Sequence, residues 1–187
     1  MNEREYDGRV RWAEDNAVED MLCVHWDRFG VSMRELCRNF PIYARRVHLK
    51  RFLAHYELFL RTINLPGDIV ELGVYRGLSL MSWANFLEVR CMGDRAKQVI
   101  GFDNWKGFTE LRPEDGAPDP RVNKVPGGYD GGQFREMLLD AIKVFDADRL
   151  APHKPRILLV DGPIEETIPR WVVENPGLRI SLLHVDC

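Results

Sequence analysis

The sequence has no two cysteines at C-x-x-C spacing; its four cysteines stand far apart, as Cys23, Cys37, Cys91 and Cys187. This distribution argues against a structural zinc site and against a disulfide framework, so the compartment we expect is a reducing cytoplasm. No apolar run reaches the ~18 residues that a membrane-spanning helix needs. The stretch from Met1 to Glu14 is too polar and charged for a signal peptide.

An excess of positive charge is also missing. Lysine and arginine number 26 against 29 acidic residues, for a formal net charge of -3. A nucleic-acid-binding surface needs clustered basic residues, so we expect no nucleic acid and no membrane as a partner, but a small-molecule substrate. With 45% hydrophobic residues over 187 positions, the chain has the material for one globular domain with a core.

The chain stops at Cys187, directly after the apolar run from Ile180 to Val185 and one acid. A terminal strand normally needs a turn and a partner strand. We therefore expect these residues to be the N-terminal part of a longer polypeptide, with the C-terminal strands of the fold missing. An unpaired strand at this point would also favour association into a homo-oligomer.

The order of elements predicts helices first, then strands and helices in alternation. Apolar residues recur at helical spacing in residues 1–40, up to a break at Pro41, and again from Ala44 to Ile63, where interspersed basic residues indicate a solvated face. Apolar strands are predicted at 68–74, 99–103, 157–161 and 180–185, and helices at 78–89, 133–145 and 164–173. This pattern predicts an α/β fold with a mostly parallel sheet covered on both faces. We divide the chain into an N-terminal helical segment, residues 1–64, and a Rossmann-like domain, residues 65–187.

The turn after the first predicted strand has an unusual composition. From Glu71 to Gly77 it follows the pattern E-x-G-x-x-x-G. Glycines let a backbone approach a ligand and reach positive φ, and the start of the next helix offers N–H groups to an anion. The spacing differs from the dinucleotide fingerprint G-x-G-x-x-G. For the glycine pair alone, a tight turn without any ligand is an equal alternative.

Two more acids end the next two predicted strands. Ligands of open parallel sheets bind beyond the carboxyl ends of the strands. Asp103 stands about 20 to 30 residues after the turn, where a carboxylate can accept hydrogen bonds from a ribose diol. Asp161 ends the third strand and could meet an adenine edge. Each acid alone is also typical of a helix N-cap, but three acids at three successive strand ends favour a nucleoside site. Trp105 and Phe108 could cover the adenosine or pack in the core.

Four motifs resemble the macrocin O-methyltransferase (TylF-type) family. They are PGDIVELGVYRGLS at 66–79, GFDNWKGF at 101–108, VDGPIEETIP at 160–169, and LHVD at 183–186, the start of an H-x-D-x-D motif. They occur in the family's order and span roughly residues 40–187. The resemblance implies a class I methyltransferase that uses S-adenosylmethionine (SAM). It also implies a magnesium-assisted reaction on a sugar hydroxyl of a natural product or a nucleotide-linked deoxysugar.

The resemblance also implies roles for individual residues. It places the methionine end of SAM at the glycine turn, the ribose at Asp103 and the adenine region at Asp161. It also makes Asp186 one of the acidic residues that bind the metal or act as the catalytic base. The implied cofactor-binding residues are Glu71, Gly73, Val74, Tyr75, Gly77, Ser79, Asp103, Asn104 and Asp161. His184 points to the same side of its strand as Asp186. There it could support the metal and catalytic residues through a hydrogen bond or, more simply, be a buried core histidine.

The chain departs from the family at its end, because the family motif continues past Asp186 with a second acid. An octahedral magnesium site could not be completed from these residues alone. The loop-rich stretch from Arg112 to Gly132 is expected to be a mobile lid or a plain surface loop. Two other functions stay open: a nicotinamide-dependent Rossmann enzyme, against which the missing third glycine counts, and a non-catalytic, truncated binding module.

Overall fold

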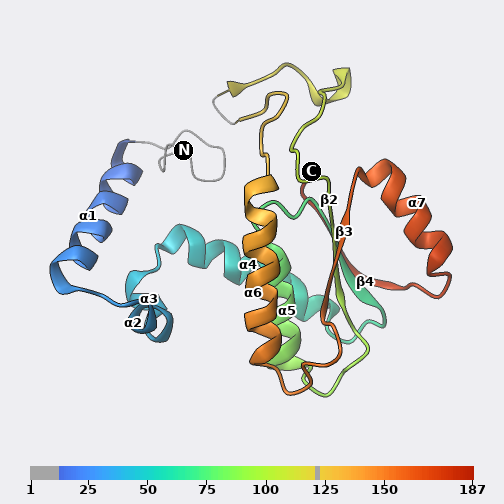
Figure 1. Ribbon diagram of the computed structural model, residues 1–187, viewed down its shortest axis with the longest axis horizontal. Helices are drawn as coiled ribbons and strands as arrows, with labels where there is room; N and C mark the ends of the chain where they lie inside the picture. Colours follow the sequence, from blue (N-terminus) through green and yellow to red (C-terminus); the bar gives the residue numbers. More distant parts are fainter. Residues whose placement is uncertain (1–12, 121–122) are drawn as a thin grey trace.

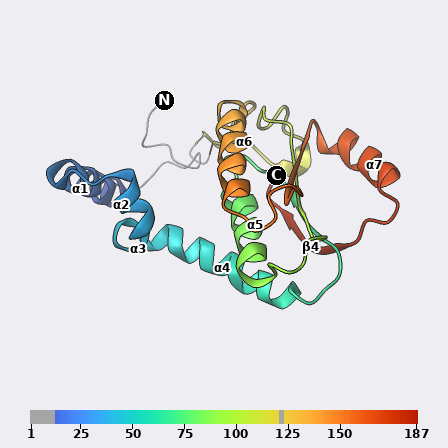
Figure 2. The same ribbon diagram turned by 60° about the horizontal axis from the view of Figure 1, so that its bottom comes forward.

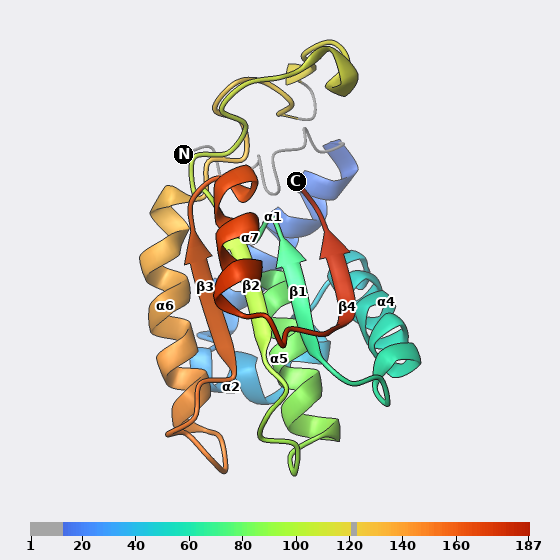
Figure 3. The same cartoon turned by 90° about the vertical axis from the view of Figure 1, so that its right-hand side faces the viewer.

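The computed structural model describes residues 13–120 and 123–187. Four parallel strands form one sheet in the order β3-β2-β1-β4 (Figure 3). Their bounds are β1 (Asp68–Leu72), β2 (Val99–Asp103), β3 (Ile157–Asp161) and β4 (Ile180–Val185). The predicted α/β fold with a parallel sheet is confirmed. The strand order reverses at β1, because the chain builds β2 and β3 on one side of it and then returns to place β4 on the other. Ligands of such sheets bind at this switch point.

Helices cover both faces of the sheet. One face carries α4 (Arg46–Thr62), α5 (Leu78–Arg90) and α6 (Gly132–Ala147), and the other carries α7 (Ile164–Glu174) (Figures 1 and 3). The larger core lies under the first three helices and is built around Phe59, Trp83 and Leu87. Under α7 a smaller cluster holds side chains from β1 and β2. Strands apolar on both faces are what this two-sided covering requires.

The N-terminal helices lie to one side of the sheet, beyond the start of α4 (Figure 2). They are α1 (Ala13–Phe29), α2 (Met33–Arg38) and α3 (Phe40–Tyr43). The predicted break at Pro41 was wrong: Pro41 stands in the first turn of α3, where its missing N–H costs no hydrogen bond. The first break comes instead at Gly30, which takes a positive φ of 57° after the end of α1. The part of the prediction that falls on residues 1–12 lies outside the described residues.

None of the helices in the described ranges is long and apolar enough to cross a membrane.

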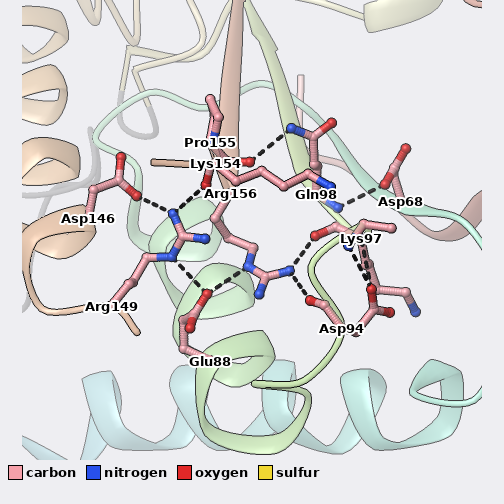
Figure 4. A network of polar contacts seen from close by, with 11 residues as sticks. Asp68, Glu88, Asp94, Lys97, Gln98, Asp146, Arg149, Lys154, Pro155 and Arg156 are labelled. Carbon is pink, nitrogen blue, oxygen red and sulfur yellow. Dashed lines mark hydrogen bonds and ion pairs between the residues drawn. The ribbon is translucent and has the colours of Figure 1, made fainter. Parts of the chain in front are cut away.

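A buried ion network holds the amino ends of the strands (Figure 4). Glu88 of α5 accepts hydrogen bonds from Nε of Arg149 at 2.8 Å and Nε of Arg156 at 2.7 Å. Arg156, only 2% exposed, also donates to the backbone carbonyls of Asp94 and Lys97. Burial raises the pKa of the Glu88 carboxyl, but the hydrogen bonds from the two arginines outweigh it and lower the pKa below its ordinary value. The network therefore joins α5, the end of α6 and the start of β3.

Replacing Glu88 with alanine should destabilise the fold strongly, by about 3–5 kcal/mol, because two buried guanidinium groups lose their shared acceptor. Since the folded-state pKa of Glu88 is lowered, its contribution is present above the unfolded-state pKa and is lost as the pH falls through the folded-state value. Urea unfolding measures the change. Asp140→Ala is the control, because Asp140 forms an exposed pair with Lys143 and should change stability by at most about 0.5 kcal/mol. Equal losses in both variants would contradict the assignment.

Candidate functional site

The turn between β1 and α5 is shaped by neighbours that approach it closely. Gly73 and Gly77 have φ values of 86° and 82°. A Cβ on Gly73 would lie 2.2 Å from the carbonyl oxygen of Asp186, and one on Gly77 would lie 2.5 Å from Leu138 of α6. The backbone contact leaves no room for a side chain at Gly73, and the positive φ favours glycine at both positions, whether or not a ligand binds. Between them Tyr75, although not a glycine, also has a positive φ of 51°.

Beneath this turn lies a fully buried carboxylate. Glu71 is 0% exposed, and its two oxygens accept hydrogen bonds from Oγ of Ser79 and from Nε1 of Trp83, each at 2.8 Å. Two of the predicted cofactor residues, Glu71 and Ser79, thus bond to each other. Trp83, which the sequence analysis did not single out, completes the set from the next turn of the same helix.

Two histidines pack beside the hydrogen-bonded pair of Glu71 and Trp83. Nδ1 of His184 lies 3.4 Å from Oε2 of Glu71, and this contact raises the pKa of His184 against the opposing effect of burial. The ring of His55 on α4 packs 5.5 Å from His184 and 4.8 Å from Trp83, between centroids. Burial, followed by the charge of His184, lowers the pKa of His55 from 6.5 to about 4. At neutral pH His55 is therefore neutral.

Asp103, at the tip of β2, is bonded to the glycine turn. Its Oδ2 accepts the backbone N–H groups of Val74 at 2.7 Å and Tyr75 at 2.8 Å. Its Oδ1 accepts the backbone N–H of Trp105 at 2.6 Å. The neighbouring Asn104 uses its side chain within its own turn, accepting from the N–H of Lys106 and donating to the carbonyl of Gly107.

Asp161, at the tip of β3, is held by Trp105 and by Arg135 of α6. Its Oδ1 accepts from Nε1 of Trp105 at 2.7 Å and from Nε of Arg135 at 3.2 Å, and its Oδ2 accepts from Nη2 of Arg135 at 2.5 Å. The Arg135 guanidinium holds the pKa of Asp161 below its ordinary value. Sequence reasoning missed Arg135, because an arginine early in a helix gives no signal that distinguishes a partner from a solvated side chain.

The hydrogen bonds that Asp103 and Asp161 already accept limit how many more each can accept from a ligand. An ionised carboxylate has about four acceptor directions. Asp103 and Asp161 each already accept three hydrogen bonds. Each therefore offers one remaining direction, enough for a single ribose hydroxyl or a single adenine N–H. Binding both ribose hydroxyls at Asp103 would require one bond to the turn to break.

Asp186 follows β4 on the other side of the switch point. Its backbone N–H donates to the carbonyl of Leu72 at 2.9 Å, which fixes it beside the glycine turn. Its exposed carboxylate lies 3.3 Å from Nη2 of Arg51 on α4. Arg51 is one of the basic residues that the sequence analysis assigned to a solvated face. Within residues 13–120 and 123–187, no three His, Cys, Asp or Glu side chains gather closely enough to hold a metal ion.

The segment between β2 and α6 rises beyond the strand tips (Figures 1 and 3). Its two ends pair with each other through Phe108 and the glycines at 127 and 128. Aromatic rings connect it to the turn, since Tyr129 packs 5.7 Å from Tyr75 and 5.6 Å from Phe108, between centroids. Part of the predicted lid, residues 121–122, lies outside the described residues, and mobility of the segment stays a prediction.

Known proteins resemble this chain in sequence, and they are O-methyltransferases. The family model for macrocin O-methyltransferase (TylF) matches residues 6–184. A curated relative from Streptomyces olivaceus, 8-demethyl-8-(2,3-dimethoxy-alpha-L-rhamnosyl)-tetracenomycin-C 4'-O-methyltransferase, is 27% identical over 157 residues, which are 82% of this chain and 56% of the relative. The chain thus spans little more than half the length of that relative.

Two solved structures of one protein, CalS11, share the fold. A crystal structure of CalS11, described as a calicheamicin methyltransferase, superposes with a TM-score of 0.84, and its apo structure, described as a TDP-rhamnose 3'-O-methyltransferase, with 0.74. Each is 25% identical to this chain and covers 94% of it, while the match covers 68% of CalS11. The resemblance inferred from the four motifs is confirmed.

Acidification should destabilise the protein through His55. Its folded-state pKa is lowered to about 4, so the unfolded chain binds more protons between pH 6.5 and about 4, and stability falls as the pH falls through that window. His184 has the opposite sign: its raised pKa gives stability that is present below the unfolded-state value and lost as the pH rises through the folded-state one. Urea unfolding at several pH values should give a shallower acid slope for His55→Phe than for wild type. His153→Phe, at an exposed turn, is the control; an unchanged slope in His55→Phe would refute the assignment.

Proposed function

Because the chain belongs to the macrocin O-methyltransferase (TylF) family, we propose that its polypeptide transfers a methyl group from SAM to a sugar hydroxyl. The acceptor class is a sugar-bearing natural product or a nucleotide-linked deoxysugar. The names of the relatives support this class, since one is named for a rhamnosyl tetracenomycin and the other for TDP-rhamnose. Family membership carries the proposal, and the site at the strand tips supports it.

The remaining acceptor directions fit the nucleoside half of SAM. Asp103 and Asp161 end adjacent strands and are paired in register, and each can accept one more hydrogen bond. In the proposal the first takes a ribose hydroxyl, beside Asn104, and the second takes an N–H of adenine. Both acids also stabilise the protein through the hydrogen bonds that they accept within the chain.

The glycine turn and the start of α5 suit the methionine half. The first N–H groups of a helix have no partner within it and attract a carboxylate. The first turn of α5 carries no acidic residue that would compete. In the proposal Gly73, Val74, Tyr75 and Gly77 border the ligand. Glu71 and Ser79 support the turn from beneath, because their bond to each other is buried.

Asp186 is the candidate general base that removes the proton from the acceptor hydroxyl. SAM supplies an electrophilic methyl group, and a sugar hydroxyl attacks it well only if a base removes its proton. The carboxylate of Asp186 is exposed beside the switch point, with Arg51 against one oxygen. Magnesium belongs to the proposal by resemblance alone. Among the described residues Asp186 is the proposed donor, and no three His, Cys, Asp or Glu side chains gather there to hold a metal ion.

The protein should bind S-adenosylhomocysteine, the demethylated product, in a calorimetric titration, and should not bind NAD. The acids at adjacent strand tips suit one nucleoside, whereas the turn lacks the third glycine of a dinucleotide fingerprint. Binding of NAD instead would support a nicotinamide-dependent enzyme. Binding of neither compound would support a non-catalytic module.

Asp186→Ala should abolish methyl transfer while leaving the affinity for S-adenosylhomocysteine within about twofold. General-base catalysis typically contributes 10²–10⁴-fold, and a loss of this order is expected in kcat. The assay follows product formation by the full native polypeptide with a rhamnosylated acceptor. Asp148→Ala, at the far end of α6, is the matched control and should keep wild-type turnover. Unchanged turnover in Asp186→Ala would remove this residue from the mechanism.

A further inference from the structure

Trp105 is the only described residue that hydrogen-bonds both acids at the tips of β2 and β3. Its backbone N–H donates to Oδ1 of Asp103 at 2.6 Å, and its indole Nε1–H donates to Oδ1 of Asp161 at 2.7 Å. Asp103 and Asp161 are register partners on neighbouring strands. The tryptophan therefore spans the two positions where the nucleoside is proposed to bind. It is 7% exposed, so its ring is fixed by packing.

The backbone of Trp105 is in an unfavourable conformation. Its φ of 61° lies in the left-handed region, which is rare for a bulky residue and costs about 1–3 kcal/mol. Glycine would adopt it without that cost. The chain at Gly131 packs closely against the ring of Trp105, since a Cβ on Gly131 would lie 3.3 Å from that ring. The hydrogen bond from the indole to Asp161 explains why a tryptophan stands here.

The indole determines which oxygen of Asp161 stays available. Oδ1 accepts two hydrogen bonds, from Trp105 and from Nε of Arg135, and is saturated. Oδ2 accepts one, from Arg135. The acceptor direction left for a ligand thus belongs to Oδ2. Arg135 is 36% exposed and can move aside, whereas the buried indole cannot.

Building on the proposed function, we propose that Trp105 is a positioning residue that sets nucleobase specificity. By holding Oδ1 of Asp161 inward it leaves Oδ2 as an acceptor for the exocyclic N–H of adenine. A 6-oxopurine presents an oxygen at the same place and would meet a second acceptor. The selected chemistry is therefore a 6-aminopurine nucleoside, and the selection depends on the indole N–H as well as on the carboxylate.

The experiment compares S-adenosylhomocysteine with S-inosylhomocysteine, which carries a 6-oxo group, by titration calorimetry on the full native polypeptide. Wild type should prefer the adenosine compound by about tenfold or more, the value of one hydrogen bond to a charged group. Trp105→Phe keeps an aromatic ring but loses the donor, and should reduce this ratio about fivefold. A purely structural role would weaken both compounds equally and leave the ratio unchanged, which would overturn the proposal. Trp171→Phe is the control, because Nε1 of Trp171 has no hydrogen-bond partner in the described part of the chain.

A second variant works even if Trp105→Phe does not fold. Asp161 and Arg135 are both partly exposed, so Asp161→Asn combined with Arg135→Ala should fold. Arg135 is removed because its Nε also donates to Oδ1 and would hold the oxygen inward without Trp105. If Trp105 holds the side-chain oxygen inward, the amide NH₂ faces the ligand and the preference inverts toward the inosine compound. If the amide is free to turn its oxygen outward, the adenosine preference persists and the proposal fails. A wild type that binds neither compound, or both equally, would instead remove the proposed nucleoside site itself.

Discussion

The two backbone hydrogen bonds from the glycine turn to Asp103 join the parts of the site. They fasten the end of β1 to the end of β2. From the same carboxylate the chain continues through Trp105 to Asp161 at the end of β3. Three strand tips are thus connected by side chains at the edge where the sheet ladder stops. Without these bonds each tip would have to be ordered by its loop alone, and loops are the least ordered parts of most folds.

The carboxylates at the two ends of the sheet have different hydrogen-bond partners. At the amino ends one oxygen of the Glu88 carboxylate accepts hydrogen bonds from two buried arginines. At the carboxyl ends Asp103 and Asp161 are held by three hydrogen bonds each and keep one acceptor direction. Glu88 binds two buried cations and so serves the fold, whereas Asp103 and Asp161 are held mainly by backbone and side-chain N–H groups at the strand tips and can be both rigid and receptive to a ligand. Preorganised acceptors of this kind lose little conformational freedom when a ligand arrives.

Much of this arrangement could be predicted from the sequence, because strand ends are local signals. Apolar runs that end in Asp103 and Asp161 place these acids at one edge of a parallel sheet, and the strands lie where the pattern predicts them. The bonds that engage the acids could not be predicted. Arg135 meets Asp161 across 26 residues of sequence, and the left-handed backbone of Trp105 violates a local preference. Pro41 misled for a related reason, since a proline can open a helix as well as end one.

Helix α4 and strand β4 touch at two points with matching spacing. Arg51 meets Asp186 and His55 meets His184, so four residues along the helix correspond to two along the strand. Four helical residues rise about 6 Å and two strand residues about 6.6 Å. The two spacings match closely enough for both contacts to form. A one-residue insertion between Arg51 and His55 would rotate the following residues by about 100°, so that the two contacts could no longer form together. The length of this piece of α4 is therefore as constrained as its composition.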